Sequence, residues 1–148
     1  MRSKLRTVEC FLVDQMLLRL GRWLRLLGLD VANPACVEDD LLMQMARKER
    51  RTLITRDKGL FAACEVAGVK CILIRSSQLE EQLREMAQKG IDLELNPQRC
   101  TLCNSPLQKV PSPERAMWRC SGCQKLYWEG AHWRKMTQML DAIRSQKG

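Results

Sequence analysis

Short apolar runs rich in strand-forming residues alternate with amphipathic segments over the first two-thirds of this sequence, and this alternation restricts the fold more than any other feature. Each apolar run predicts a strand and each amphipathic segment a helix. Strands that alternate with helices form parallel sheets joined by right-handed crossovers. The sequence therefore predicts an α/β fold, a three-layer domain with a mostly parallel sheet over residues 1–95. Strands are expected at 8–13, 29–33, 51–55 and 70–75, and helices at 16–27, 39–50, 60–67 and 78–89.

Apolar spacing also indicates which helix faces are buried and where the helices begin and end. Gly28 is suited to end the first helix, because glycine accepts the left-handed conformation common at that position. Asp39 is suited to cap the second helix with its carboxylate. The buried face of the first helix is expected to hold Met16, Leu20, Leu24 and Leu27.

Four cysteines in two CxxC pairs mark a second unit, predicted over residues 96–148 and ending in a basic amphipathic helix from Trp133 to Arg144. Cys100 and Cys103 are followed, after sixteen intervening residues, by Cys120 and Cys123. Two such pairs supply the four thiolates of a tetrahedral zinc ribbon. Because sulfur fills every position, this zinc is expected to hold structure and to leave no place for a catalytic water. A CxxC redox couple is the alternative interpretation.

Positive charge is concentrated in this second unit. From residue 99 onward there are nine basic and three acidic residues, and the whole chain has a net charge of +8, which favours an anionic partner such as nucleic acid. Aromatic residues interleave with the basic ones, a mixture that pairs with phosphates and stacks on unpaired bases. We therefore expect single-stranded RNA or DNA to bind through Arg119, Lys125 and Arg134. Trp118, Tyr127 and Trp128 could instead form the small core of the ribbon, and its surface could bind a protein.

Other patterns exclude several classes of protein. The longest stretch without a charged residue has nine residues, which is shorter than the roughly 20 apolar residues of a membrane helix. Glu9, Asp14 and Arg19 interrupt what would have to be an apolar export signal. The cysteines outside the CxxC pairs lie singly in apolar stretches, so we expect reduced thiols and an intracellular location, cytoplasmic or nuclear. A nuclease that uses two imidazoles is excluded, because His132 is the single histidine.

Acidic residues follow the predicted strands at the edge where open α/β sheets bind their ligands. Asp14 comes directly after the first strand, and Asp57 follows the third. Glu38, Asp39 and Asp40 lie at the start of a helix. Carboxylates gathered in one crevice repel one another unless a divalent cation neutralises them, and oxygen ligands select Mg²⁺ or Mn²⁺. Alternatively, each acid serves only as a helix cap or a turn residue.

Long ordered motifs give the sequence a family resemblance over roughly residues 8–140. They are DQMLLRLGRWLRLLGLD from Asp14, DDLLMQMA from Asp39, RTLITRD from Arg51, the RC-x2-CN pair, and the final C-x2-C-x3-YW-x-G-x-HW. The sequence resembles the PIN-like ribonuclease domain with an appended zinc ribbon, the module at the C-terminus of Mut-seven-type exonucleases and of stand-alone prokaryotic relatives.

This resemblance implies a metal-dependent ribonuclease with a PIN-like fold and an Mg²⁺ or Mn²⁺ centre. It implies that Asp14, Asp39 and Asp57 bind the metal, with Asp40 as a substitute for Asp39. The first helix and the TRD turn border the expected crevice, so Arg22, Arg25, Arg56 and Lys58 are candidates for contacts with phosphates, although Arg25 could equally be structural. An inactive nucleic-acid-binding module and a zinc-ribbon platform for protein interactions remain the alternatives.

Overall fold

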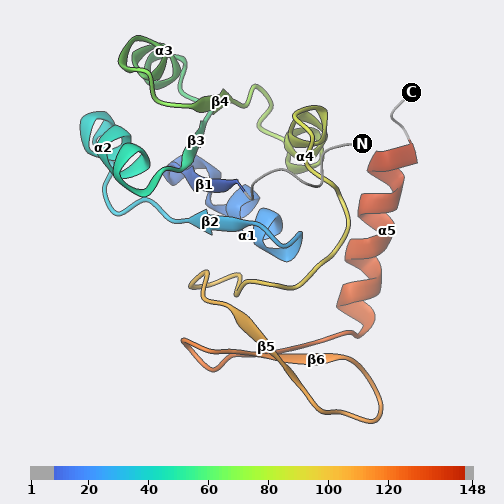
Figure 1. Cartoon of the computed structure of the whole chain (residues 1–148). Coiled ribbons are helices and arrows are strands. Elements are labelled where there is room, and N and C mark those ends of the chain that lie inside the picture. Colours follow the sequence, from blue (N-terminus) through green and yellow to red (C-terminus); the bar gives the residue numbers. More distant parts are fainter. Residues whose placement is uncertain (1–8, 146–148) are drawn as a thin grey trace.

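The computed structural model describes residues 9–145 and contains two sheets, a larger parallel one and a smaller antiparallel one (Figure 1). The strand order of the larger sheet is β2-β1-β3-β4, and its neighbouring strands all pair in parallel. This architecture confirms the predicted α/β fold. The elements of this part are β1 (Cys10–Val13), η1 (Gln15–Leu17), α1 (Leu18–Leu26), β2 (Asp30–Ala32), α2 (Asp39–Glu49), β3 (Thr52–Thr55), α3 (Lys58–Ala67), β4 (Cys71–Leu73) and α4 (Leu79–Gln88).

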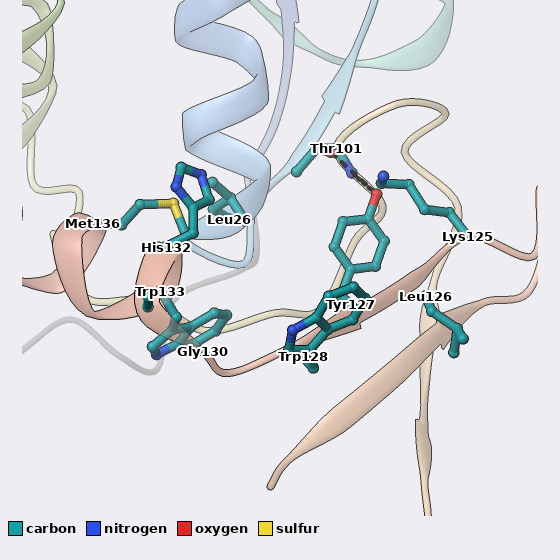
Figure 2. A pocket seen from close by; sticks show the side chains of 11 residues that line it. Leu26, Thr101, Lys125, Leu126, Tyr127, Trp128, Gly130, His132, Trp133 and Met136 are labelled. Carbon is teal, nitrogen blue, oxygen red and sulfur yellow. Dashed lines mark hydrogen bonds between the residues drawn. The ribbon is translucent and has the colours of Figure 1, made fainter.

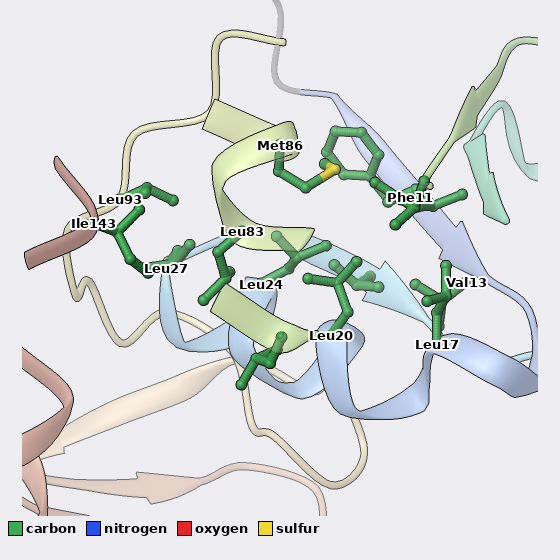
Figure 3. Packing of buried hydrophobic residues seen from close by; sticks show 14 of the residues in the cluster. Phe11, Val13, Leu17, Leu20, Leu24, Leu27, Leu83, Met86, Leu93 and Ile143 are labelled. Carbon is green, nitrogen blue, oxygen red and sulfur yellow. The ribbon is translucent and has the colours of Figure 1, made fainter. Parts of the chain in front are cut away.

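Helices cover both faces of the larger sheet, because successive strand residues point to opposite sides. On one face, Phe11 and Val13 of β1 pack with leucines of α1 and α4 (Figure 3). On the other face, Leu12 packs with residues of α2 and α3, among them Leu42 and Leu60. The sheet is therefore the middle of three layers.

The first helix lies close to the sheet because of a glycine. A Cβ atom at Gly21 would lie 3.1 Å from Cγ2 of Val13, which is tight for a side chain. Gly28, just past the end of α1, has a φ of +93° and fulfils the expected terminating role. Gly21 thus lets α1 lie close to β1, and Gly28 ends the helix.

The smaller sheet consists of β5 (Leu107–Val110), β6 (Met117–Cys120) and β7 (Leu126–Trp128), and the last helix, α5 (Ala131–Ser145), follows it. This helix leaves the small sheet and runs back toward α4 (Figure 1). Its residues Leu140 and Ile143 belong to the same buried cluster as Leu27, Leu83 and Leu93 (Figure 3). The two predicted units are thus joined by an apolar contact.

The ribbon also contacts the edge strand β2. The backbone N–H of Val31 donates to Oδ1 of Asn104 at 3.1 Å, and Nδ2 of Asn104 donates to Oδ1 of Asp30 at 2.6 Å. Arg99 forms an ion pair with Asp30 at 3.5 Å. These contacts satisfy polar groups at an edge that would otherwise be open to another strand.

Two details of the first helices differ from the sequence prediction. Met16 is 64% exposed, because Gln15–Leu17 forms a 3₁₀ turn that points Leu17 inward in its place. Asp39 is the first residue of α2 and the N-cap is Glu38, so Asp39 does not cap the helix. Among residues 9–145, no helix has the length and apolar character needed to cross a membrane.

Candidate functional site

The chain reverses its direction of travel across the sheet between β1 and β3. From β1 it moves outward to β2, and it then crosses back to place β3 on the other side of β1. Open α/β sheets bind ligands at the carboxyl ends of strands at such a point of reversal. Asp14 immediately follows β1, and one residue, Arg56, separates Asp57 from the end of β3. The topology therefore brings these two predicted site residues to the same end of adjacent strands.

A buried hydroxyl connects the two aspartates. The hydroxyl of Thr55, which is fully buried, donates to Oδ2 of Asp14 and accepts the backbone N–H of Asp57 at 3.0 Å. The other oxygen of Asp14 accepts the backbone N–H of Met16 at 3.0 Å. Asp14 itself is only 6% exposed. Its carboxylate is thus fixed in orientation at the carboxyl end of β1.

Asp57 is exposed and is held by the helix that follows it. Its Oδ1 accepts the backbone N–H groups of Gly59 at 2.8 Å and Leu60 at 3.1 Å, which makes it the N-cap of α3. No described residue donates a hydrogen bond to its Oδ2. Asp57 therefore serves as a cap and still presents one carboxylate oxygen to a ligand.

Asp39 and Asp40 lie in the first turn of α2, exposed and, within residues 9–145, without a hydrogen bond or an ion pair. Desolvation, followed by the negative charges of Asp57, Asp40 and Asp14, raises the pKa of the Asp39 carboxyl above its ordinary value. The charges of Asp57 and Asp14 therefore act on Asp39, although desolvation is the larger cause of the shift.

The acidic residues have no basic partner in the described part of the chain: the ion pairs found there involve other carboxylates. Their oxygens suit Mg²⁺ or Mn²⁺, which prefer hard oxygen ligands. The carboxylates are nevertheless spread out, since the four cysteines of the ribbon are the one group of three or more potential ligands within 4.8 Å of one another in residues 9–145. The oxygens thus have the chemistry that a divalent cation prefers, whereas the described side chains do not place three of them around one ion.

The basic residues predicted near this edge have different surroundings. Arg22 and Lys58 are exposed. Arg56 donates to the backbone carbonyl of Arg75 at 3.4 Å, and its Nε is buried without a hydrogen-bond partner in the described residues. Arg22 and Lys58 are accessible to a phosphate, whereas the guanidinium of Arg56 already donates a hydrogen bond within the protein.

Arg25 corrects one part of the sequence prediction, because it is 1% exposed and does not face a ligand. Its guanidinium donates to the carbonyls of Val31 at 2.8 Å and Thr101 at 2.6 Å, and to Oδ1 of Asn33 at 2.9 Å. All three nitrogens of the guanidinium are engaged, and they join α1, β2 and the ribbon. The structural interpretation of Arg25 is the one that the contacts support.

The four ribbon cysteines converge on one point. Their sulfurs all lie within 4.8 Å of one another, with Cys100 and Cys123 separated by 3.7 Å and Cys103 and Cys120 by 3.4 Å. A tetrahedral zinc with Zn–S bonds of 2.3 Å requires sulfurs about 3.8 Å apart. The residues present therefore fit a four-thiolate zinc site, as predicted from their spacing.

The two CxxC turns have the same backbone design. The N–H of the residue after each pair, Asn104 or Gln124, donates to the carbonyl of the first cysteine of that pair, at 2.9 and 3.1 Å. Both residues have positive φ angles, 65° and 69°. Hydrogen bonds from the side chain and backbone of Ser105 lower the pKa of the Cys103 thiol to about 6, which favours the thiolate that binds metal.

Some aromatic side chains of the ribbon pack against neighbouring groups, and one of them is exposed. The rings of Trp118 and Trp133 are stacked, with centroids 5.6 Å apart. The hydroxyl of Tyr127 lies 3.0 Å from Sγ of Cys100. Trp128, in contrast, is 51% exposed, so it does not belong to the ribbon core. The basic residues Arg119, Lys125 and Arg134 are exposed as well, and the predicted mixture of aromatic and basic groups thus reaches the surface.

Sequence reasoning did not identify Thr55 as part of the site. The sequence places it only at the end of the predicted buried strand 51–55. The TRD motif holds a signal that could have identified it, since a hydroxyl two residues before a candidate ligand can accept that ligand's N–H, as in an ST turn. The hydrogen bond to Asp14, 41 residues away, has no local signal.

Residues 9–140 match a family model described as the Mut7-C RNAse domain. The match begins at the first strand and ends within α5, so it includes the acidic edge and all four ribbon cysteines. No curated protein and no solved structure matches the chain.

Proposed function

Because this chain belongs to the Mut7-C RNAse domain family, as its motifs indicated, we propose that it is a metal-dependent ribonuclease that hydrolyses RNA phosphodiester bonds. One observation carries the proposal. Asp14 and Asp57 follow adjacent strands at the reversal point of the sheet, their charges add to desolvation in raising the pKa of Asp39, and these three acids have no basic partner among residues 9–145. An uncompensated acidic edge of this kind is suited to a divalent cation.

In this proposal Mg²⁺ or Mn²⁺, when bound, lowers the pKa of a water molecule and stabilises the charge that develops on the phosphate. The carboxylates act as ligands, and no side chain attacks the phosphorus. Thr55 and the N–H of Met16 hold Asp14 in place, and the first turn of α3 holds Asp57. Asp39, with Asp40 as its substitute, supplies a charge that no basic residue of the described chain neutralises.

We propose that the ribbon, with zinc held by its four cysteines, helps to bind the RNA strand. Exposed Arg119, Lys125 and Arg134 offer charges for phosphates, and exposed Trp128 offers a ring for an unpaired base. Arg22 and Lys58 would contact phosphates nearer the acidic edge. The preferred substrate in this proposal is single-stranded RNA.

The test compares cleavage of a labelled single-stranded RNA by three zinc-loaded proteins: the original chain, Asp57→Asn, and Asp92→Asn as a matched control. Asp92 is exposed, has no hydrogen bond or ion pair in the described residues, and lies far along the sequence from the strand ends. Asp57→Asn should lose Mg²⁺-dependent cleavage by about 100-fold or more. Its oxygen can still cap α3, so the far-ultraviolet circular dichroism should not change.

Unchanged cleavage by Asp57→Asn would contradict the assignment of this site. A second function, an inactive nucleic-acid-binding module, is favoured by the spread of the carboxylates, because no three of them lie within 4.8 Å of one another in residues 9–145. That function predicts tight RNA binding by the original chain with no Mg²⁺-dependent turnover at all.

A further inference from the structure

A pocket of about 340 Å³ lies where the end of α1, the first CxxC turn, β7 and the start of α5 meet (Figure 2). Figure 2 shows His132 and Met136 beside Leu26 on one side, and Tyr127 with Lys125 on the other. Because its walls come from the α/β part, the ribbon and α5, the pocket exists only when these parts are assembled.

Two aromatic walls of the pocket are fixed by contacts behind them. The hydroxyl of Tyr127 accepts the backbone N–H of Thr101 at 3.2 Å and lies 3.1 Å from its Oγ1. Trp133 is held by its stacking on Trp118. Rigid aromatic walls lose little conformational freedom when a ligand binds, and this favours affinity.

The third aromatic wall, Trp128, is accessible. Half of its surface is exposed, and the guanidinium of Arg115 lies 6.0 Å from the centre of its ring. On the other side, the ammonium of Lys125 lies 5.3 Å from the ring of Tyr127. No carboxylate lines the pocket, so its charge is positive. A ligand that fits it has a flat aromatic part and a negative group beside it.

We propose that this pocket binds one unpaired base of an RNA strand, with Lys125 and Arg115 contacting the phosphates on either side of that base. The proposal rests on the proposed function and specifies how the ribbon recognises its substrate. A base offers a flat π surface to Trp128 whatever its identity, so binding here distinguishes single strands from duplexes, whose bases are already stacked. A hydrophobic peptide would leave the positive charges without partners.

The experiment measures the affinity of the full zinc-loaded chain for labelled hexauridylate and for the same ribose-phosphate chain without bases, by fluorescence anisotropy and without added Mg²⁺. The original chain should bind hexauridylate about 5- to 150-fold more tightly, the range expected for stacking of one base. Trp128→Ala should bind both probes with equal affinity, whereas Trp128→Phe should retain most of the difference. Leu102→Ala, which removes an exposed apolar residue of the ribbon outside the pocket, should bind as the original chain does.

A further variant tests the charged part of the site. Lys125→Ala should weaken binding of both probes and reduce the slope of log affinity against log salt by about 0.7, the value for one phosphate contact on a single strand. The proposal is overturned if Trp128→Ala weakens both probes equally or leaves their ratio unchanged, and also if the original chain does not distinguish the probes.

The two proposals fail in different ways. Mg²⁺-dependent cleavage without any preference for the probe with bases overturns the pocket assignment and leaves the ribonuclease proposal standing. A clear preference for that probe, together with no cleavage of any RNA, overturns the ribonuclease proposal and leaves the pocket assignment standing.

Discussion

Replacing Arg25 by methionine tests whether this arginine joins the two parts of the molecule. Its side chain is 1% exposed and donates to two backbone carbonyls, those of Val31 and Thr101, and to Asn33. Methionine keeps much of the apolar volume but cannot donate a hydrogen bond. The variant therefore leaves these acceptors without their donor while it disturbs the packing little.

The magnitude follows from what each acceptor loses. An unsatisfied buried acceptor costs about 1–3 kcal/mol, and the half-buried Thr101 carbonyl can recover part of its loss from water. Burial lowers the pKa of Arg25, so removal of its charge returns part of the desolvation cost. Together these effects predict a loss of about 2–4 kcal/mol in the free energy of unfolding, or roughly 4–16 °C in the melting temperature.

The assay is thermal unfolding followed by circular dichroism, with RNA affinity measured on the same proteins. Arg22→Met is the matched control, because Arg22 lies on the same helix and is exposed. Arg25→Met should melt at a lower temperature, whereas Arg22→Met should melt normally and bind RNA more weakly. If Arg25→Met kept its stability and lost only RNA affinity, the structural role of Arg25 would be refuted.

The remaining predictions concern the acidic edge and the ribbon. Asp39→Asn should melt at a higher temperature than the original chain at neutral pH in the absence of divalent ions, because a raised pKa means that the ionised carboxyl destabilises the folded state; equal melting would contradict this. Thr55→Val should weaken Mn²⁺ binding measured by calorimetry and lower stability by about 1–3 kcal/mol, and Thr55→Ser should restore both, since it keeps the hydroxyl. Chelation of zinc should abolish the near-ultraviolet circular dichroism of the stacked Trp118 and Trp133, while most of the far-ultraviolet signal of the helices persists. An unchanged spectrum would refute the zinc site.

The α/β fold could be predicted because its elements are encoded locally. Apolar runs such as that of 51–55 identify buried strands without any knowledge of their neighbours. Asp14 and Asp57 could be placed at the ligand-binding edge because each comes directly after or close behind such a run. The tetrahedral cluster of cysteines could be predicted for the same reason, since the ligands of each pair are separated by two residues.

Long-range contacts could not be predicted in this way. The sequence leaves open whether Arg25 contacts a phosphate or is structural, because its acceptor on Thr101 lies 76 residues away in the ribbon. The apolar face of α5 was visible in the sequence, but its packing against Leu93 and Leu83 was not. The spacing of Met16 fits the buried face of an ideal helix, but Met16 lies in a 3₁₀ turn that Asp14 caps, and there its side chain is exposed. In each case a contact or a turn outweighed the local pattern.

Binding of Mn²⁺ measured by electron paramagnetic resonance tests most directly whether the acidic edge binds a divalent cation, whether or not the protein cleaves RNA. We predict saturable binding of Mn²⁺ to the zinc-loaded chain, loss of that binding in Asp14→Asn and Asp57→Asn, and normal binding in Asp92→Asn. Absence of saturable binding to the original chain, or equal binding to all of these variants, would contradict the account.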